Sequence, residues 1–163
     1  MSELKGLSVV LKNLNKAISD IEFNTKEGLT EAALVVKYDS VKGTPIDLGN
    51  LRNSCFIMVT DSQTDNPVPL FRQEKTEGGM ITDDIQRLIS DHERCISEAR
   101  GIVAEGKNKF NAIVGYTANY ALWVHEMPSH YNFNSGSNKF LEKALLKNKN
   151  RILRILVKHA KLK

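Results

Sequence analysis

The chain has few cysteines, few aromatic residues and no long apolar run. Its 163 residues include two cysteines and one tryptophan, and 7% of them are aromatic. Cys55 and Cys95 form neither a C-x-x-C motif nor a disulfide framework, so we expect two buried thiols in a reducing cytoplasm. No apolar run approaches the roughly 18 residues of a membrane span, and the first residues lack the basic and apolar regions of a signal peptide. We therefore expect no membrane contact and no secretion.

Motifs for catalysis and for metal binding are also missing. The sequence holds no glycine-rich phosphate loop, no G-x-S-x-G motif and no recognisable pair of catalytic carboxylates. His125 and His130 are five residues apart with Pro128 between them, whereas zinc proteases place two histidines four apart on one helix. His92 lies on an apolar helical stripe and is expected to pack in the core. We therefore expect no enzyme activity, no metal ion and no cofactor.

The composition predicts one globular domain over residues 1–163. Apolar residues make up 41% of the chain and charged residues 26%, which is typical of a folded protein. The length suits a single domain. Residues 61–108 are expected to be an insertion into this domain, made of a loop and a long helix.

The charge is unevenly distributed along the chain. The net charge is +4, but residues 139–163 carry seven lysines, two arginines and one glutamate, a sum of +8, so the remaining residues sum to −4. Three interpretations of this basic C-terminal helix stay open: contact with DNA phosphates, docking on an acidic neighbouring subunit, or a face turned to solvent. The cations recur at three or four residues: Lys143, Lys147, Arg151, Arg154 and Lys158.

Two amphipathic helices are predicted at the N-terminal end. A break is expected at residues 23–25, where Asn24 or Thr25 would cap a second helix that continues to about Gly43. The second helix would turn Ala32, Ala33 and Val36 toward the core. The first helix has a single apolar stripe with spacings of three and four residues: Leu4, Leu7, Leu11, Leu14, Ile18 and Ile21.

The central part of the chain predicts two strands and one long helix. Apolar runs at 55–60 and 111–116 indicate buried strands, and Leu70 and Phe71 indicate a short third one. A helix is expected at about 82–104, capped by Thr82 or Asp83.

The stretch 110–126 is expected to anchor the fold because it combines a strand, a short helix and large aromatic side chains. Tyr120 and Trp123 are expected in the core rather than at an interface. The polar segment 127–137 that follows is predicted to be a loop.

Four segments together resemble a known protein family. The opening helix begins Glu3-Leu-Lys-Gly-Leu7, and residues 44–54 read T-P-I-D-L-G-N-L-R-N-S, similar to the signature P-V-D-T-G-x-L-R-x-S, with Leu48 in place of the usual threonine. Residues 114–126 are similar to a strand followed by Y-A-x-x-V-H-E, and residues 139–145 to a closing F-L-x-x-A helix. In this order they resemble the neck, or tail-completion, proteins of tailed bacteriophages.

The resemblance implies an α+β fold, with N-terminal and C-terminal helices packed on a small, mainly antiparallel sheet. It implies a virion structural protein, made in the host cytoplasm, that forms a ring between the head connector and the tail tube. The ring is expected to be a hexamer, with other copies of the chain, the connector or stopper and the tail tube or terminator proteins as partners, and with non-specific contact to passing DNA. Two alternatives stay open: a tail terminator that caps the tube, and a small basic nucleic-acid-binding protein acting through the C-terminal helix.

The same segments supply the candidate site residues. Asp47 is expected to cap a short helical turn, and the signature residues form either a structural corner, which we favour, or a contact with a neighbouring subunit. The polar residues at 125 and 126 would form capping or subunit contacts, and the loop 127–137 is either an arm that contacts another subunit or a mobile loop. The candidates are Asp47, Gly49, Leu51, Arg52, Tyr120, Trp123, His125 and Glu126, with Tyr131 and Phe133 for subunit contact.

Overall fold

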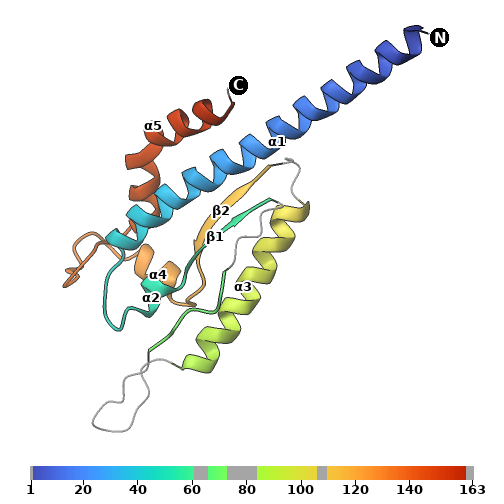
Figure 1. Ribbon diagram of the computed structural model, residues 1–163. Helices are drawn as coiled ribbons and strands as arrows, with labels where there is room; N and C mark the ends of the chain where they lie inside the picture. Colours follow the sequence, from blue (N-terminus) through green and yellow to red (C-terminus); the bar gives the residue numbers. More distant parts are fainter. Residues whose placement is uncertain (1, 61–65, 73–83, 106–109, 161–163) are drawn as a thin grey trace.

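The protein has a mixed α+β fold, as the resemblance implied. The computed structural model describes residues 2–60, 66–72, 84–105 and 110–160. Helices lie on both faces of a two-stranded antiparallel sheet (Figure 1). In chain order the elements are α1 (Ser2–Gly43), α2 (Asn50–Asn53), β1 (Cys55–Val59), α3 (Ile85–Glu105), β2 (Ala112–Tyr116), α4 (Ala121–His125) and α5 (Phe140–Ala160).

The sheet is formed by the two strands that the sequence predicts most clearly. The register places Cys55 opposite Tyr116 and Val59 opposite Ala112. Every residue of β1 is buried, because α1 covers one face of the sheet and α3 covers the other. Successive side chains of a strand point to opposite faces. One face therefore packs against α3 in a core cluster that contains Phe56, Met58, Ile96, Ala99 and Val103, with Ile113 beside it.

Helix α1 is continuous, and the predicted break at residues 23–25 is wrong. The Thr25 hydroxyl donates to the carbonyl of Ile21 (2.8 Å) one turn earlier, instead of capping a new helix. The Thr30 hydroxyl donates to the carbonyl of Lys26 in the same way (2.9 Å). Both polar side chains are thus satisfied inside the helix, and nothing forces the backbone to turn.

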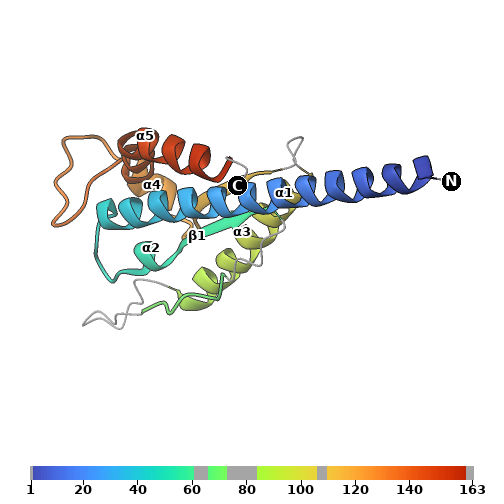
Figure 2. The same ribbon diagram turned by 45° about the horizontal axis from the view of Figure 1, so that its top comes forward.

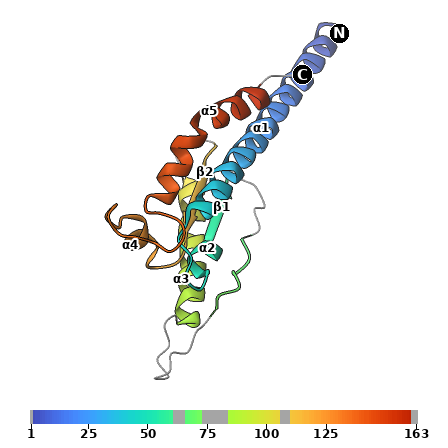
Figure 3. The ribbon, with the colours of Figure 1, turned by 90° about the vertical axis from the view of Figure 1, so that its left-hand side faces the viewer.

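Helix α5 packs along the C-terminal half of α1 (Figure 3). Its buried Asn148 donates from Nδ2 to the Asp39 carboxylate (2.7 Å), which also pairs with the Lys147 ammonium (3.0 Å). A second link joins His159 to the Glu31 carboxylate (2.9 Å). These polar contacts fix the register of α5 against α1.

The carboxyl group of Asp39 should make the stability of the fold depend on pH. The hydrogen bond from Asn148, followed by the contact with Lys147, lowers the pKa of Asp39 below its ordinary value of 3.8. Such a carboxylate stabilises the folded state above that ordinary value, and the contribution is lost as the pH falls through the folded-state pKa. We expect Asp39→Asn to lower the free energy of unfolding at neutral pH and to differ less from the original protein below pH 3.8.

Urea denaturation at a series of pH values measures this difference. Asp47→Asn serves as the matched control, because Asp47 is exposed and forms no ion pair with a described residue. A destabilisation by Asp39→Asn that stays constant down to acid pH would contradict the expectation.

Helix α3 joins both core clusters, although the sequence places it in an insertion. Its Leu88 packs with Leu51, Phe71 and Phe140 in a second cluster. The helix begins at Ile85, one or two residues later than a cap at 83 or 82 implies. The Asp84 carboxylate accepts from the amides of residues 86 (3.0 Å) and 87 (3.2 Å). The caps expected at 82 and 83 lie outside the described residues.

Residues 66–72 run beside β1 as irregular chain, so the predicted strand at 70 and 71 is wrong. Two asparagine side chains take the place of strand pairing. The amide of Asn66 donates to the Ile57 carbonyl (2.7 Å) and accepts from the Ile57 N–H (3.4 Å). The amide of Asn50 exchanges the same two bonds with the backbone of Arg72, both at 2.7 Å.

The packing role predicted for His92 is confirmed. Its side chain is buried, with Nδ1 3.1 Å from the Thr117 hydroxyl and Nε2 3.4 Å from the Asn66 carbonyl. Of the two free thiols, Cys55 is buried, and burial raises its pKa to about 11, whereas Cys95 is half-buried.

Candidate functional site

The signature segment 44–54 forms a tightly bonded corner between α1 and β1. Gly49 has a φ of 86°, in the left-handed region, and directly precedes α2. The expectation that Asp47 caps this helix is wrong, because α2 starts at Asn50 and its first turn has no side-chain cap. The conformation at Gly49 lets the chain enter the helix without one.

Tyr116 connects this corner to α1 beneath the surface. Its hydroxyl hydrogen-bonds to the hydroxyls of Ser40 (2.7 Å) and Thr44 (2.8 Å), and both of these residues are fully buried. Burial raises the pKa of Tyr116 well above its usual range, so it stays a neutral donor and acceptor. Its ring meets Phe140 edge-on, with 5.0 Å between the centroids. The start of α5 is thereby joined to the corner.

Arg52 lies at the junction of the corner, the end of α1 and the loop 127–137. Its guanidinium donates to the carbonyls of Thr44 (2.9 Å) and Lys42 (3.3 Å) and reaches the Ser135 hydroxyl at 3.5 Å. The last carbonyls of a helix lack partners within it. Arg52 therefore caps α1 and holds one end of the loop.

The loop 127–137 is fixed at its C-terminal end and lies open at its centre. The amide of Ser137 donates to the Gly43 carbonyl (2.9 Å), and Gly136 has a φ of 78°. The rings of Tyr131 and Phe133 contact each other at a centroid distance of 5.0 Å, and 53% of Tyr131 is exposed. The loop, called the arm below, therefore exposes Tyr131 and holds Phe133 half-buried beside it.

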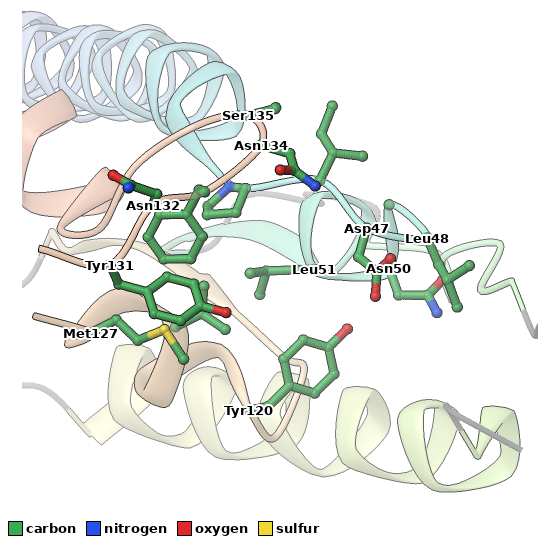
Figure 4. Close-up of a pocket in the computed structure, with 15 residues that line it drawn as sticks. Asp47, Leu48, Asn50, Leu51, Tyr120, Met127, Tyr131, Asn132, Asn134 and Ser135 are labelled. Carbon is green, nitrogen blue, oxygen red and sulfur yellow. The ribbon is translucent and has the colours of Figure 1, made fainter.

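A groove of about 540 Å³ lies between this arm and the corner. Figure 4 shows the turn 45–50 on one side and the arm, with Met127 and Tyr131, on the other. The side chain of Leu51 lies between them. Tyr120 closes one end. The groove brings together six of the predicted site residues: Asp47, Gly49, Leu51, Tyr120, Tyr131 and Phe133.

His125 and Glu126 lie outside this groove and link α4 to α5. His125 Nδ1 is 2.7 Å from a Glu126 carboxylate oxygen, and that carboxylate also accepts from the Lys139 ammonium. The contact with Lys139, followed by the one with His125, lowers the pKa of Glu126. The backbone amide of Lys139 donates to the His125 carbonyl (2.8 Å). These residues act as a bridge across the base of the loop.

Trp123 is not in the core, and the expectation that it packs there is wrong. Its side chain is 77% exposed, and the neighbouring Leu122 is 71% exposed. Helix α4 is only five residues long and buries one side, with Ala121 and Val124 inward at a spacing of three. Tyr120, by contrast, is half-buried against the core.

Besides Leu122 and Trp123 on α4, the N-terminal half of α1 also exposes an apolar surface. The sequence predicts its stripe, but no described part of the chain covers it. The helix projects beyond the sheet and the other helices (Figures 1 and 2). Four large side chains of the stripe are about half exposed: Leu11 (49%), Leu14 (53%), Ile18 (45%) and Ile21 (44%).

An apolar groove that sequence reasoning missed lies between α1, β2 and α5. Its volume is about 310 Å³. No single segment signals it, because three elements distant in sequence form it together. Residues from each element line it, among them Ala32 and Ala33 of α1, Ala112 and Val114 of β2, and Leu145 and Leu156 of α5.

The predicted cations of α5 are all exposed. Lys147 pairs with Asp39, and Lys143 donates to the Ser137 hydroxyl (3.2 Å) and the Asn138 side chain (3.0 Å). Arg151, Arg154 and Lys158 form no ion pair within the described ranges. A basic strip therefore remains open to solvent along the outer half of the helix.

The described part of the chain contains no group of three histidine, cysteine, aspartate or glutamate side chains that could hold a metal ion. Within the same residues, no helix combines the length and the apolar character needed to cross a membrane. Comparisons with protein-family models, with curated proteins and with solved structures found no match.

Proposed function

We propose that this chain is a structural subunit of the neck of a tailed bacteriophage, where copies form a ring that joins the head connector to the tail tube. Its role is assembly rather than catalysis, and its place is the assembled virion. Completion of the neck is the favoured position, and termination of the tail tube is the alternative.

One observation carries the proposal: an apolar stripe on a projecting helix that the chain itself leaves uncovered. Leu11, Leu14 and Ile18 are each 45–53% exposed and lie at consecutive stripe positions. Soluble monomers rarely expose contiguous apolar surfaces, and larger ones mark interaction sites. Leu122 and Trp123 add a second exposed apolar site on α4. Such surfaces are expected in a subunit whose neighbours cover them in an assembly.

The order of the four resembling segments supports the choice of assembly. The signature residues 44–54 form an ordered corner, and the segments 114–126 and 139–145 meet it through Tyr116, the His125–Glu126–Lys139 bridge and Phe140. Three of the four segments that carry the resemblance therefore lie together in one region, and the opening segment lies at the projecting end of α1. The α+β fold is also the one that the family resemblance implies.

The mass of the purified protein in solution tests the proposal. We expect light scattering to give a multiple of the 18.3 kDa chain mass, close to six copies, and negative-stain images of the same fraction to show rings with a central hole. A protein that neither forms rings nor binds connector or tail components would contradict the proposal.

The exposed basic strip on α5 favours one second candidate, contact with nucleic acid. Phosphate contacts by lysine and arginine are independent of base sequence and weaken steeply with salt. We expect the triple variant Arg151→Glu, Arg154→Glu, Lys158→Glu to lose most of its retention on DNA at low salt. The oligomeric mass should stay unchanged.

Gel-shift titration at two salt concentrations measures this retention. The control reverses three exposed cations away from α5, at Lys12, Lys16 and Arg100. Equal retention by the original protein and the α5 variant would remove the nucleic-acid candidate.

A further inference from the structure

An exposed apolar stripe and an open apolar groove of the described chain both involve helix α1. The spacing of Leu11, Leu14, Ile18 and Ile21 continues through Thr25 to Ala32 and Val36, which are buried beside the sheet and α5. One continuous stripe is thus covered in its C-terminal half and uncovered in its N-terminal half. Both halves are apolar, but the uncovered half carries leucine and isoleucine, whereas the covered half carries alanine and valine at these positions.

The groove between α1, β2 and α5 has the complementary character. All of its lining residues are apolar: three alanines, Ala32, Ala33 and Ala112, lie beside larger leucine, isoleucine and valine side chains. Its volume of about 310 Å³ leaves room for apolar side chains from elsewhere. The exposed stripe consists of leucine and isoleucine. Leu145, 53% exposed, lines the groove on the α5 side.

The stripe cannot enter the groove of its own chain. Helix α1 runs without a break from Ser2 to Gly43, and its N-terminal half points away from the rest of the molecule (Figure 2). Folding back would require the helix to break between residues 21 and 29, where its hydrogen bonding is intact. Any contact between stripe and groove is therefore a contact between two copies.

We propose that the N-terminal half of α1 from one copy docks in the apolar groove between α1, β2 and α5 of the next copy. Leu11, Leu14, Ile18 and Ile21 supply the anchors at the spacing of a helix that lies in a groove. The inference rests on the proposed assembly role and names the contact through which the copies assemble. Stripe and groove are different patches, so the contact is heterologous and generates a ring where the rotation closes.

Two charge variants test the two sides of the contact separately. Ile18→Glu places a charge on the stripe, and Leu145→Glu places one at the groove. The matched controls are Ser19→Glu, an exposed position next to Ile18, and Leu146→Glu, which is 64% exposed on α5 but does not line the groove. Circular dichroism and thermal unfolding confirm that each variant is folded.

We expect Ile18→Glu and Leu145→Glu each to raise the concentration needed for assembly by roughly tenfold to a hundredfold. Both controls should assemble like the original protein. Mixing the two defective variants is the decisive experiment. In the mixture, the intact stripe of Leu145→Glu can dock in the intact groove of Ile18→Glu, and no further copy can be added. Light scattering should therefore show a one-to-one pair with twice the mass of one chain.

Three outcomes would overturn the inference. Normal assembly of Ile18→Glu would show that the stripe is not the contact. Normal assembly of Leu145→Glu, with failure of Ile18→Glu, would show that stripes pair with each other as a coiled coil. An original protein that stays monomeric at every concentration would exclude this self-docking, while binding to connector or tail components would still support the proposed place in the neck.

Discussion

Replacing Phe140 with alanine is expected to lower the free energy of unfolding by about 3 to 5 kcal/mol. The side chain is only 2% exposed and stands where three parts of the fold meet. Its ring contacts Tyr116 of β2 and His125 of α4 edge-on, at centroid distances of 5.0 and 4.9 Å. Truncation would leave a cavity among these rigid neighbours. Since small domains are stable by about 5 to 15 kcal/mol, the loss is a large part of the total.

Urea denaturation of Phe140→Ala beside Phe23→Ala measures this effect. The control removes the same atoms from a side chain that is 61% exposed on α1, and it should change the free energy by no more than about 0.5 kcal/mol. Phe140→Leu should fall between the two variants, because it retains most of the volume. Equal small losses for all three would show that the junction is not packed as described.

Gly136→Ala is expected to detach the arm 127–137 from the end of α1. A Cβ atom at this position would lie 2.5 Å from the Pro45 nitrogen and 2.7 Å from the Gly43 carbonyl oxygen, and both of these are backbone atoms. The φ of 78° adds strain for any residue with a side chain. The loop must therefore move away, with loss of the Ser137–Gly43 hydrogen bond. We expect a destabilisation of about 2 to 4 kcal/mol and faster hydrogen exchange at the Ser137 amide.

Gly49→Ala is the control that measures the cost of a positive φ without a steric clash. Gly49 has a similar φ of 86°, but a Cβ atom there would meet nothing within 4 Å. Its substitution should cost only about 1 kcal/mol. If the two alanine variants were equally stable, the close approach of the arm to the corner would be refuted.

The elements with strong periodicity could be predicted from the sequence. The strands at 55–60 and 111–116 and the helix at 82–104 match β1, β2 and α3 within a few residues. Only β1 is buried as expected, whereas β2 is half-buried with Ala112 exposed. The helix carries a long stripe at helical spacing, and the two strand segments are short apolar runs rich in β-branched or aromatic residues, whose length favours strands. The buried packing of His92 follows from its position on such a stripe.

Local polar residues and single side chains were harder to predict. Thr25 looks like a helix cap, but its hydroxyl bonds within the helix, and sequence does not distinguish the two uses. Phe71 is as apolar as a strand residue, yet it packs in the core from irregular chain. Trp123 is exposed because a helix of one turn buries only one side. For Phe71 and Trp123 tertiary packing decides, whereas for Thr25 two local hydrogen-bonding arrangements compete.

The candidate site could also be predicted only in part from the sequence. The residues of the signature could be selected from their pattern, but the groove that they form with the arm could not. Asp47 and Tyr131 are 84 positions apart, and only the connection through Arg52, Gly136 and Phe140 sets one segment opposite the other. The apolar groove beside α5 depends on three elements at once and leaves no signal in any of them.

The length of α1 also affects how the molecule moves through water. At a rise of about 1.5 Å per residue, its 42 residues extend for about 63 Å. A compact domain of 163 residues has a radius of gyration of about 15 Å, which corresponds to a sphere about 40 Å across. The helix exceeds this diameter, so friction is higher than for a sphere of equal mass. A single copy should elute early from a sizing column and resemble a small oligomer, whereas light scattering reports its mass independently of shape.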